Sequence, residues 1–309
     1  MDFLSRVEKV LEEEHFVPGK KEQKSLTKKY KDENFSLTME EKYLYLLTRM
    51  PATVRVIRRV LQELDALEEK EKIKNILDVG SGPGSSFFAL EEFFPDVEKI
   101  TYIERDPDFI RLGKKLTQAS SITWERKDCA KNFTLPVADL TLFSYSIGEM
   151  SEDVVKKIFC EWSQHEGLFL VLIEPGTPKG FSKIAWAKEF FLSYPFSVVA
   201  PCPHGKKCPL IKDFCHFSTR VNRSSSHRMA KEGSLGYEDE KFSYIIFSKK
   251  AGAEGLPRIL RHPLKRKGHM IFSLCTSEGL LEKTVSRKDE GYKAGKKLEW
   301  GDRFSINKC

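Results

Sequence analysis

The middle of the chain alternates short apolar runs with stretches of helical period. The apolar runs predict strands at residues 75–79, 99–104, 122–125, 139–145 and 168–174. The helical stretches between them lie at residues 85–94, 107–118 and 152–164. Strands that alternate with helices at this spacing are typical of a parallel sheet covered by helices. We therefore predict a doubly wound, Rossmann-like α/β fold for this part of the chain.

The flanking stretches have other patterns. Residues 39–71 have a helical period that Pro51 interrupts, which predicts two helices. Residues 18–34 are highly charged and have no apolar period, so we expect a loose arm, or one that becomes ordered against a partner. Residues 244–248 predict a further strand, and residues 257–309 favour strands and turns, which indicates a small C-terminal β module.

Charge is unevenly distributed along the 309 residues. Residues 201–309 carry 23 Lys and Arg against 12 Asp and Glu, a net charge of +11, whereas residues 1–200 have a net charge of −4. This asymmetry favours a polyanion bound by the C-terminal third over a merely solvated basic surface.

No apolar run approaches the ~20 residues that a membrane helix needs. Residues 1–16 are rich in glutamate and lack the pattern of a signal or transit peptide. We therefore predict a cytoplasmic protein without a membrane partner, which is monomeric when free.

A glycine-rich turn, Gly80-Ser81-Gly82-Pro83-Gly84, follows the first predicted strand and its Asp78. Glycines let the backbone turn tightly and approach a ligand, and the next helix points its N-terminal amides at that ligand. Glu104 ends the second strand, where a carboxylate can bind two ribose hydroxyls; Asp106 is an alternative for this role. Asp128 follows the third strand and is a candidate to hold an adenine amino group. The candidate cofactor-binding residues are therefore Asp78, Gly80, Ser81, Gly82, Gly84, Glu104 and Asp128.

This turn resembles that of the class I methyltransferases rather than the G-x-G-x-x-G turn of dinucleotide-binding folds. The resemblance implies S-adenosylmethionine as the cofactor; an empty or repurposed pocket is the alternative. The Asn/Asp-Pro-Pro-aromatic motif of amino methyltransferases is absent after the fourth strand. Tyr145 and Glu149 stand there instead, either as contacts to a target base or, as we favour, as structural residues. No catalytic residue is assigned.

Four of the seven cysteines are candidate metal ligands. Three of them fall within fourteen positions of a polar, proline-rich stretch, and thiolates suit zinc or an iron–sulfur cluster. Their spacing is wider than that of zinc knuckles and fits a cluster held by loops somewhat better. The candidates are Cys202, Cys208, Cys215 and Cys275, with His204 and His216 as rival ligands. A nucleophilic role for Cys202, as in cytosine-C5 methylation, is less favoured, and no chemistry is assigned to Cys129, Cys160 or Cys309.

Longer strings resemble the mitochondrial small-ribosomal-subunit methyltransferase-like family and its bacterial relatives. They are residues 49–61 (RMPATVRVIRRVL), 174–181 (EPGTPKGF), 202–244, 262–269 (HPLKRKGH) and 300–302 (WGD). The resemblance implies binding to the small ribosomal subunit during its assembly. It also implies a four-iron, four-sulfur cluster on the four cysteines at 202, 208, 215 and 275. The missing transit peptide favours a bacterial relative.

The expected function is that of an S-adenosylmethionine-dependent methyltransferase acting on small-subunit rRNA. The alternatives are a non-catalytic rRNA-binding assembly factor and, less favoured, a small-molecule methyltransferase with structural zinc. Expected contacts to rRNA phosphates are Arg220, Arg223, Arg228, Arg261, Lys265, Arg266 and Lys267. Arg220 and Arg223 have a structural alternative, in which they pair with Glu238, Asp239 or Glu240.

The expected fold class is thus a Rossmann-like class I methyltransferase with N-terminal helices, a Cys-rich metal-binding insertion and a small C-terminal β module. The expected parts are an N-terminal arm with helices (1–72), an S-adenosylmethionine-binding domain (73–200), a Cys-rich cluster segment with the last strands (201–250) and a basic β module (251–309).

Overall fold

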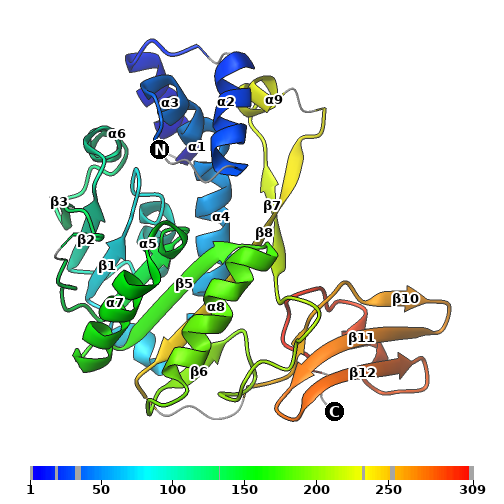
Figure 1. Ribbon diagram of the computed structural model, residues 1–309. Coiled ribbons are helices and arrows are strands. Elements are labelled where there is room, and N and C mark those ends of the chain that lie inside the picture. The colour runs from blue at the N-terminus through cyan, green and yellow to red at the C-terminus, as the bar shows by residue number, and fades with distance from the viewer. Residues whose placement is uncertain are drawn as a thin grey trace. The chain divides into compact units, whose positions relative to one another are not determined.

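A computed structural model describes residues 3–17, 20–31, 36–131, 133–231, 234–250 and 255–305 (Figure 1). The chain divides into two compact units, each of which draws on two stretches of sequence. Unit 1 comprises Met1–Gly167 and Thr219–Glu240, and unit 2 comprises Leu168–Ser218 and Lys241–Cys309.

Unit 1 contains four parallel strands in the order β3-β2-β1-β4. They are β1 (Asn75–Val79), β2 (Lys99–Glu104), β3 (Ile122–Arg126) and β4 (Leu140–Ser144). The helices that connect or follow them are α5 (Phe87–Phe93), α6 (Pro107–Leu116) and α7 (Glu152–Gln164). The central strands β1, β2 and β4 are buried almost throughout, as expected of parallel strands covered on both faces. This arrangement confirms the strands and helices predicted from the alternating pattern.

Four helices precede the first strand. They are α1 (Phe3–Glu13), α2 (Lys20–Lys31), α3 (Met39–Thr48) and α4 (Met50–Leu61), followed by short 3-10 turns at Gln62–Leu64 and Glu68–Lys72. Thr38 caps α3 in a capping box with Glu41, and Pro51 stands in the first turn of α4, where proline is tolerated. The break predicted at Pro51 is therefore the start of a new helix.

The prediction of a loose arm at residues 18–34 is wrong where helix α2 forms. Residues 20–31 are helical, and Leu26 is 1% exposed although its neighbours in sequence are mostly polar. Ser25 Oγ donates to Glu41 at 2.6 Å, and Lys29 Nζ pairs with the same carboxylate at 2.6 Å. One apolar anchor and one buried carboxylate on α3 thus hold a helix that has no apolar period of its own.

The second stretch of unit 1, Thr219–Glu240, forms most of a hairpin. It consists of β7 (Phe217–Asn222), α9 (Ser225–Lys231) and the first half of β8 (Tyr237–Ser248), which pairs with β7. Helix α9 lies against α2 and α3 (Figure 1). Strand β8 is longer than the predicted strand at 244–248, because its polar first half pairs with β7.

Unit 2 contains β5 (Phe169–Pro175), α8 (Pro178–Phe191) and β6 (Ser197–Ala200), besides the second half of β8. Strand β8 runs antiparallel to both β5 and β6, with Ile173 opposite Tyr244 and Val198 opposite Phe247. Helix α8 packs on β5. The chain therefore combines parallel ladders in unit 1 with antiparallel ladders in unit 2, a mixed α/β pairing that the purely parallel prediction did not include.

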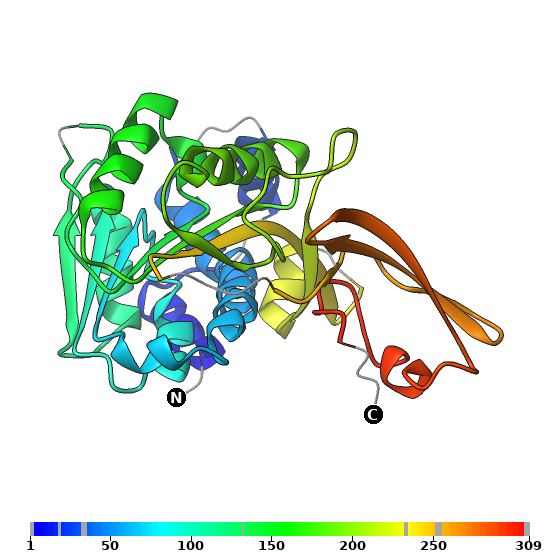
Figure 2. The same ribbon diagram turned by 90° about the horizontal axis from the view of Figure 1, so that it is seen from below.

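The C-terminal part of unit 2 forms a separate antiparallel sheet. Its strands are β9 (Arg258–Ile259), β10 (Leu264–Arg266), β11 (His269–Thr276) and β12 (Gly279–Ser286), followed by the short helix α10 (Tyr292–Gly295). Figure 2 shows the long strands β11 and β12 side by side, in orange. Among the residues that the structure describes, no helix is both long and apolar enough to cross a membrane.

Candidate functional site

The glycine-rich turn that leaves β1 is held against the end of β2. The amides of Gly80 and Ser81 donate to Ile103 O at 2.8 and 3.1 Å, and the Gly82 amide donates to Glu104 Oε2 at 2.8 Å. The turn has left-handed backbone at Gly80 (φ +72°), Gly82 (φ +54°) and Gly84 (φ +75°). Side chains rarely adopt this conformation, which accounts for the glycines.

Glu104 is fixed by three backbone donors. Besides Gly82, the amides of Arg105 and Asp106 donate to its Oε1, each at 2.8 Å. Burial raises the pKa of Glu104, and the three backbone hydrogen bonds act in the opposite direction. The rival carboxylate, Asp106, instead caps α6 and binds Lys42 Nζ at 2.7 Å. Asp106 therefore has a structural role in capping α6, and Glu104 is the better candidate for the ribose-binding carboxylate beside the turn.

Asp78 is a buried carboxyl group behind the turn. Ser86 Oγ donates to its Oδ2, whereas its Oδ1 has no hydrogen-bond partner among the described residues. Burial raises the pKa of Asp78 to about 7, the Ser86 hydrogen bond lowers it, and the charge of Glu104 raises it further. Ser81 Oγ is also buried without a described partner. Buried polar atoms of this kind are usually satisfied by a ligand or water.

The loops after β3 and β4 reach the same place. Asp128 Oδ1 accepts from Ala130 N at 3.1 Å, and the neighbouring thiol of Cys129 has its pKa raised to about 12 by burial and by the charges of Glu104 and Asp128. Ser146 Oγ, after β4, donates to Val79 O at 2.7 Å. The carboxyl ends of all four parallel strands thus meet at the glycine turn.

Two further residues after β4 have unusual surroundings. Tyr145 has a left-handed backbone, with φ +60°, which is strained for a non-glycine residue. Glu149, in the 3-10 turn Ile147–Glu149, pairs with Arg105 at 3.3 Å. Burial raises the pKa of Glu149 to about 7, Arg105 lowers it, and Glu104 raises it. Arg105, Ser86 and Ser146 were not predicted from the sequence because they carry no motif; Arg105 and Ser146 are far from the turn in sequence, and Ser86 follows it by two residues.

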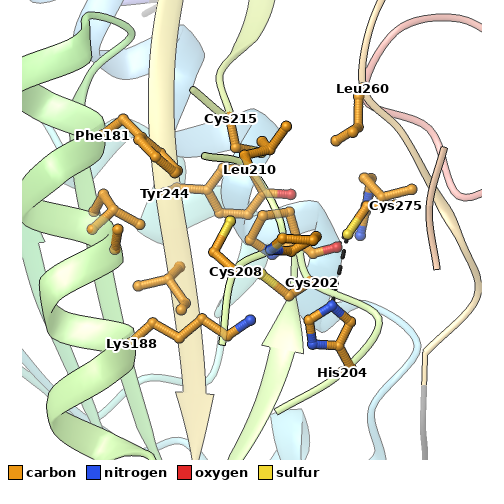
Figure 3. Close-up of a pocket in the computed structure, with 16 residues that line it drawn as sticks. Phe181, Lys188, Cys202, His204, Cys208, Leu210, Cys215, Tyr244, Leu260 and Cys275 are labelled. Atoms are coloured by element: carbon orange, nitrogen blue, oxygen red, sulfur yellow. Dashed lines mark hydrogen bonds between the residues drawn. The ribbon is translucent and has the colours of Figure 1, made fainter. Parts of the chain in front are cut away.

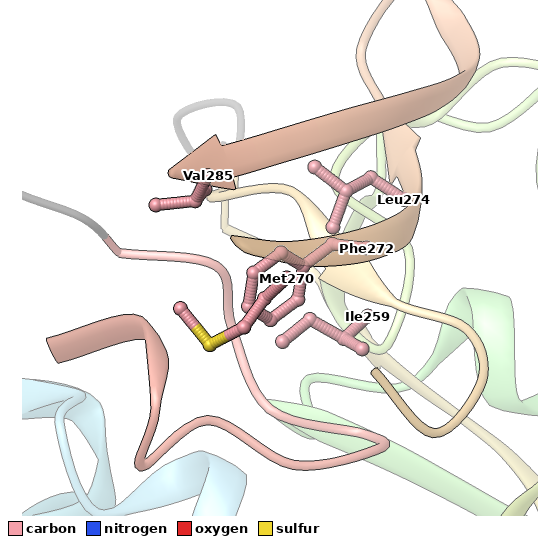
Figure 4. Close-up of a cluster of buried hydrophobic side chains, with 5 residues drawn as sticks. All are labelled: Ile259, Met270, Phe272, Leu274 and Val285. Atoms are coloured by element: carbon pink, nitrogen blue, oxygen red, sulfur yellow. The ribbon is translucent and has the colours of Figure 1, made fainter. Parts of the chain in front are cut away.

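The four candidate cysteines line one pocket in unit 2 (Figure 3). Cys202, Cys208 and Cys215 come from the segment between β6 and β7, and Cys275 comes from β11. The pocket has an empty volume of about 550 Å³, which includes space open to solvent. Next to Cys275 on β11, Leu274 packs into the core of the C-terminal sheet with Ile259, Met270, Phe272 and Val285 (Figure 4).

Cys275 is buried and the other three cysteines are partly buried in this pocket. Burial raises the pKa of Cys275 to about 12, with Cys202 and Cys208 adding to the shift. Burial raises the pKa of Cys215 well above its ordinary range, again with contributions from the other three thiols. Within the described residues, however, no group of three or more His, Cys, Asp or Glu side chains is arranged to hold a metal ion. Tetrahedral zinc would need its thiolates about 3.8 Å apart, given zinc–sulfur bonds of about 2.3 Å.

Of the two histidines weighed as rival ligands, His204 lines the cysteine pocket, whereas His216 does not. His204 Nδ1 accepts from Lys206 N at 3.1 Å, and its Nε2 lies 3.8 Å from Cys275 Sγ. His216 stacks on Phe214 at 4.4 Å between ring centroids and meets Trp300 edge-on at 4.9 Å. Of the cysteines without assigned chemistry, Cys160 is exposed on α7, and Cys309 lies outside the described residues.

Two of the predicted phosphate contacts are engaged by acidic neighbours within unit 1. Arg220 pairs with Asp239 at 3.1 Å, and its guanidinium lies 4.0 Å from the centre of the Tyr237 ring. Arg223 pairs with Glu238 at 2.6 Å, and Lys231 pairs with the same carboxylate at 2.8 Å. These ion pairs match the structural alternative for Glu238 and Asp239.

The other predicted phosphate contacts differ in exposure. Arg261 is bound to Asp213 and to the Phe214 carbonyl, and Lys265 pairs with Glu299 at 3.0 Å. The remaining three are exposed, on α9 or at the turn between β10 and β11: Arg228, Arg266 and Lys267.

The parallel order β3-β2-β1-β4, the glycine turn after β1, the carboxylate at the end of β2 and the antiparallel β5–β8 ladder define a class I methyltransferase-like protein with a Rossmann-like α/β fold. Within this class, the chain belongs to the family described as mitochondrial small ribosomal subunit Rsm22, whose family model matches residues 39–305.

Named relatives agree with this family. The chain is 25% identical to the Rsm22-cox11 tandem protein 2, mitochondrial, of Schizosaccharomyces pombe, over 98% of this chain and 47% of that protein. It is 26% identical to the human ribosome assembly protein METTL17, mitochondrial, over 90% of this chain and 65% of that protein. The chain therefore spans about half to two thirds of the length of these relatives.

Solved structures with a similar fold include the magnesium protoporphyrin IX methyltransferase of Synechocystis PCC 6803. It has a TM-score of 0.41 and 10% identity, over 64% of this chain and 84% of that one. The fold assignment rests on the chain's own strand order and turn geometry.

The predicted cytoplasmic location is wrong, because the Rsm22-cox11 tandem proteins 1 and 2 of Schizosaccharomyces pombe, human METTL17 and RSM22 of Saccharomyces cerevisiae are all named as mitochondrial proteins. Their names also give no support to a bacterial relative. The glutamate-rich composition of residues 1–16 alone does not determine the compartment.

Two of the three glycines of the turn, Gly80 and Gly82, should respond differently to substitution by alanine. A Cβ at Gly82 would meet only Tyr45 Oη, at 3.9 Å, so Gly82→Ala should cost about 1–2 kcal/mol of unfolding free energy from backbone strain alone. A Cβ at Gly80 would lie 2.5 Å from Ser146 Cβ, so Gly80→Ala should cost distinctly more. Urea denaturation of the two variants measures this difference, and equal losses would contradict the described packing of the turn.

Proposed function

We propose that this chain is an assembly factor of the mitochondrial small ribosomal subunit and binds small-subunit rRNA. The observation that carries the proposal is the Rsm22 family match over residues 39–305, which includes most of both units. Two relatives, human METTL17 and RSM22 of Saccharomyces cerevisiae, are named ribosome assembly proteins. The chain spans only part of each of these two relatives, so the proposal includes the assumption that this part carries their assembly function.

The charge of the C-terminal third supports an RNA partner. Residues 201–309 have a net charge of +11, and phosphate contacts supply most of the affinity in such complexes. Arg266 and Lys267 are exposed where β10 turns into β11, so they are available to phosphates without breaking an internal contact. Arg223 and Arg261, by contrast, already bind protein neighbours, Glu238 and the Phe214 carbonyl. They would support RNA binding by stabilising the local fold rather than by contacting phosphates.

S-adenosylmethionine is the cofactor that the turn of unit 1 fits. Space is open beside Gly82, where a Cβ would meet nothing closer than 3.9 Å, so a ligand can approach the backbone there. Glu104 would bind the ribose hydroxyls and Asp128 the adenine amino group. The unpaired Oδ1 of Asp78 offers an acceptor behind the turn. When bound, the cofactor would supply an activated methyl group.

A four-iron, four-sulfur cluster is the group that we propose for the cysteine pocket. Four thiols line one pocket, and the raised pKa of Cys215 and Cys275 shows that their thiolate forms are costly to bury there without a positively charged partner. Among the described residues, no group of three or more His, Cys, Asp or Glu side chains stands at the distance of a single ion. A cluster is larger than one ion, so its thiolates stand farther apart. Cys202, Cys208, Cys215 and Cys275 would hold it, and its role would be to fix the loop between β6 and β7.

Methyl transfer to rRNA is a second candidate function. The observation that favours it is the loop after β4, where the strained Tyr145 and the carboxyl group of Glu149 lie beside the glycine turn. Strained residues cluster at active sites, and a carboxyl group with a pKa near neutrality suits proton transfer. Radioactive methyl incorporation into small-subunit rRNA separates this function from binding alone.

RNA binding should be steeply dependent on salt. We expect the affinity for small-subunit rRNA to fall by about 10³-fold or more between about 50 and 200 mM salt. The double variant Arg266→Ala/Lys267→Ala should lower the slope of log affinity against log salt by about 2. Filter binding at several salt concentrations measures both effects.

The matched control is Lys72→Ala/Lys99→Ala, which removes two exposed lysines from unit 1 and should leave the slope unchanged. Salt-independent binding by the unmodified protein, or equal affinity for an unrelated RNA of the same length, would contradict the proposal.

The cysteine pocket should hold iron and sulfide. We expect about four irons and four sulfides per chain after purification without oxygen, since each cluster carries four of each. Cys208→Ser should lose most of this iron, whereas Cys160→Ser, which changes an exposed thiol, should retain it. Iron, sulfide and zinc assays decide the matter: one zinc per chain, or an equal loss in both variants, would refute the cluster.

A further inference from the structure

Lys188 is a buried lysine that enters the cysteine pocket from α8 (Figure 3). Its side chain is 4% exposed, and its Nζ has no hydrogen-bond partner among the described residues. Burial raises the pKa of both Cys208 and Cys275, and the positive charge of Lys188 opposes that rise, so Lys188 acts on sulfurs from two different segments. A lone buried ammonium is strongly unfavourable, so its position calls for a negatively charged partner in the pocket.

Other polar groups at the pocket have defined partners. Arg258, 2% exposed, donates to the carbonyl oxygens of Pro201 and Gly301 at 3.0 and 2.8 Å. His204 Nδ1 accepts a hydrogen bond from Lys206 N, so a neutral His204 carries its proton on Nε2. That Nε2–H lies 3.8 Å from Cys275 Sγ and can donate to it. The pocket thus offers the sulfurs one weak neutral donor, His204, and two buried cations, of which Arg258 is held by carbonyl oxygens.

We infer that Lys188 is a positioning residue for the iron–sulfur group: its ammonium is the charge partner of the four thiolates and raises the reduction potential of a cluster bound by them. The inference rests on the proposed function, which places the cluster in this pocket. Four thiolates outweigh the charge of an oxidised four-iron, four-sulfur core and leave the site negative. Lys188 and Arg258 together offset that excess.

The charge of Lys188 should act on one-electron reduction in a definite direction. Dithionite supplies the electron, which adds one negative charge to the cluster while all four iron–thiolate bonds remain. A nearby ammonium stabilises the more negative, reduced form, so its removal makes reduction harder. Without the cluster the same ammonium is buried among neutral thiols, where it weakens the fold. Its removal should therefore have opposite effects with and without the cluster.

The experiment compares three variants of the full chain, loaded with iron and sulfide without oxygen. Lys188→Met removes the charge at similar length, Lys188→Arg keeps it, and Lys183→Met changes another lysine of α8 that does not line the pocket. A dithionite titration followed by electron paramagnetic resonance gives the midpoint potential. Thermal melting in the presence of a chelator gives the stability of the iron-free fold.

We expect Lys188→Met to lower the reduced-to-oxidised ratio at a fixed potential by about tenfold, a shift of 59 mV for one electron. Its iron-free form should melt no lower than the unmodified protein. Lys188→Arg and Lys183→Met should keep the original potential. Loss of iron from Lys188→Met, with its iron-free melting unchanged, would also support the inference, because the thiolates would then need that charge to hold the cluster.

An unchanged potential in fully loaded Lys188→Met would overturn the inference and leave the proposed cluster standing. An equal shift in Lys183→Met would overturn it as well. Absence of iron from the unmodified protein would instead refute the cluster, and the inference with it.

Discussion

The hydrogen bond from the Gly82 amide to the Glu104 carboxylate is the interaction on which unit 1 depends. It ties the turn after β1 to the end of β2, while two further amides hold the other oxygen of the same carboxylate. The turn can follow this path only with left-handed backbone, and Ser146 closes its far side by donating to Val79 O. The result is a preorganised acceptor beside an open stretch of backbone, built from strand ends that meet at one edge.

Unit 2 is stabilised in a different way from unit 1. The segment between β6 and β7 has few apolar residues, so a hydrophobic core alone does not fix it. Its cysteines converge with Cys275, which the C-terminal sheet presents from β11, and Lys188 adds a buried charge from α8. Thiolates and an ammonium are each costly to bury alone, and in one pocket each offsets the charge of the other. The stability of this unit is therefore expected to depend on what the pocket holds.

The sequence predicted those features that rest on local patterns. The strands that contain Asp78 and Glu104 are continuous apolar runs, and the glycine spacing follows from the left-handed backbone that the turn requires. Both features could therefore be predicted without knowledge of the fold. Helix α2 was missed because its anchors, Leu26 and the Glu41 carboxylate, act through tertiary contacts. The antiparallel direction of β8 was missed for the same reason, since apolar runs do not encode strand direction.

The role of Lys188 was likewise hidden, because nothing local distinguishes it from the other lysines of α8. Its burial comes from packing against a segment distant in the chain.

Calorimetric titration can measure whether the turn held by Glu104 binds S-adenosylmethionine. We expect one site per chain, and binding at least about tenfold weaker in Glu104→Gln, which loses the charged acceptor for the ribose hydroxyls. No binding by the unmodified protein, or equal affinity in the two proteins, would show that this turn is not the cofactor site.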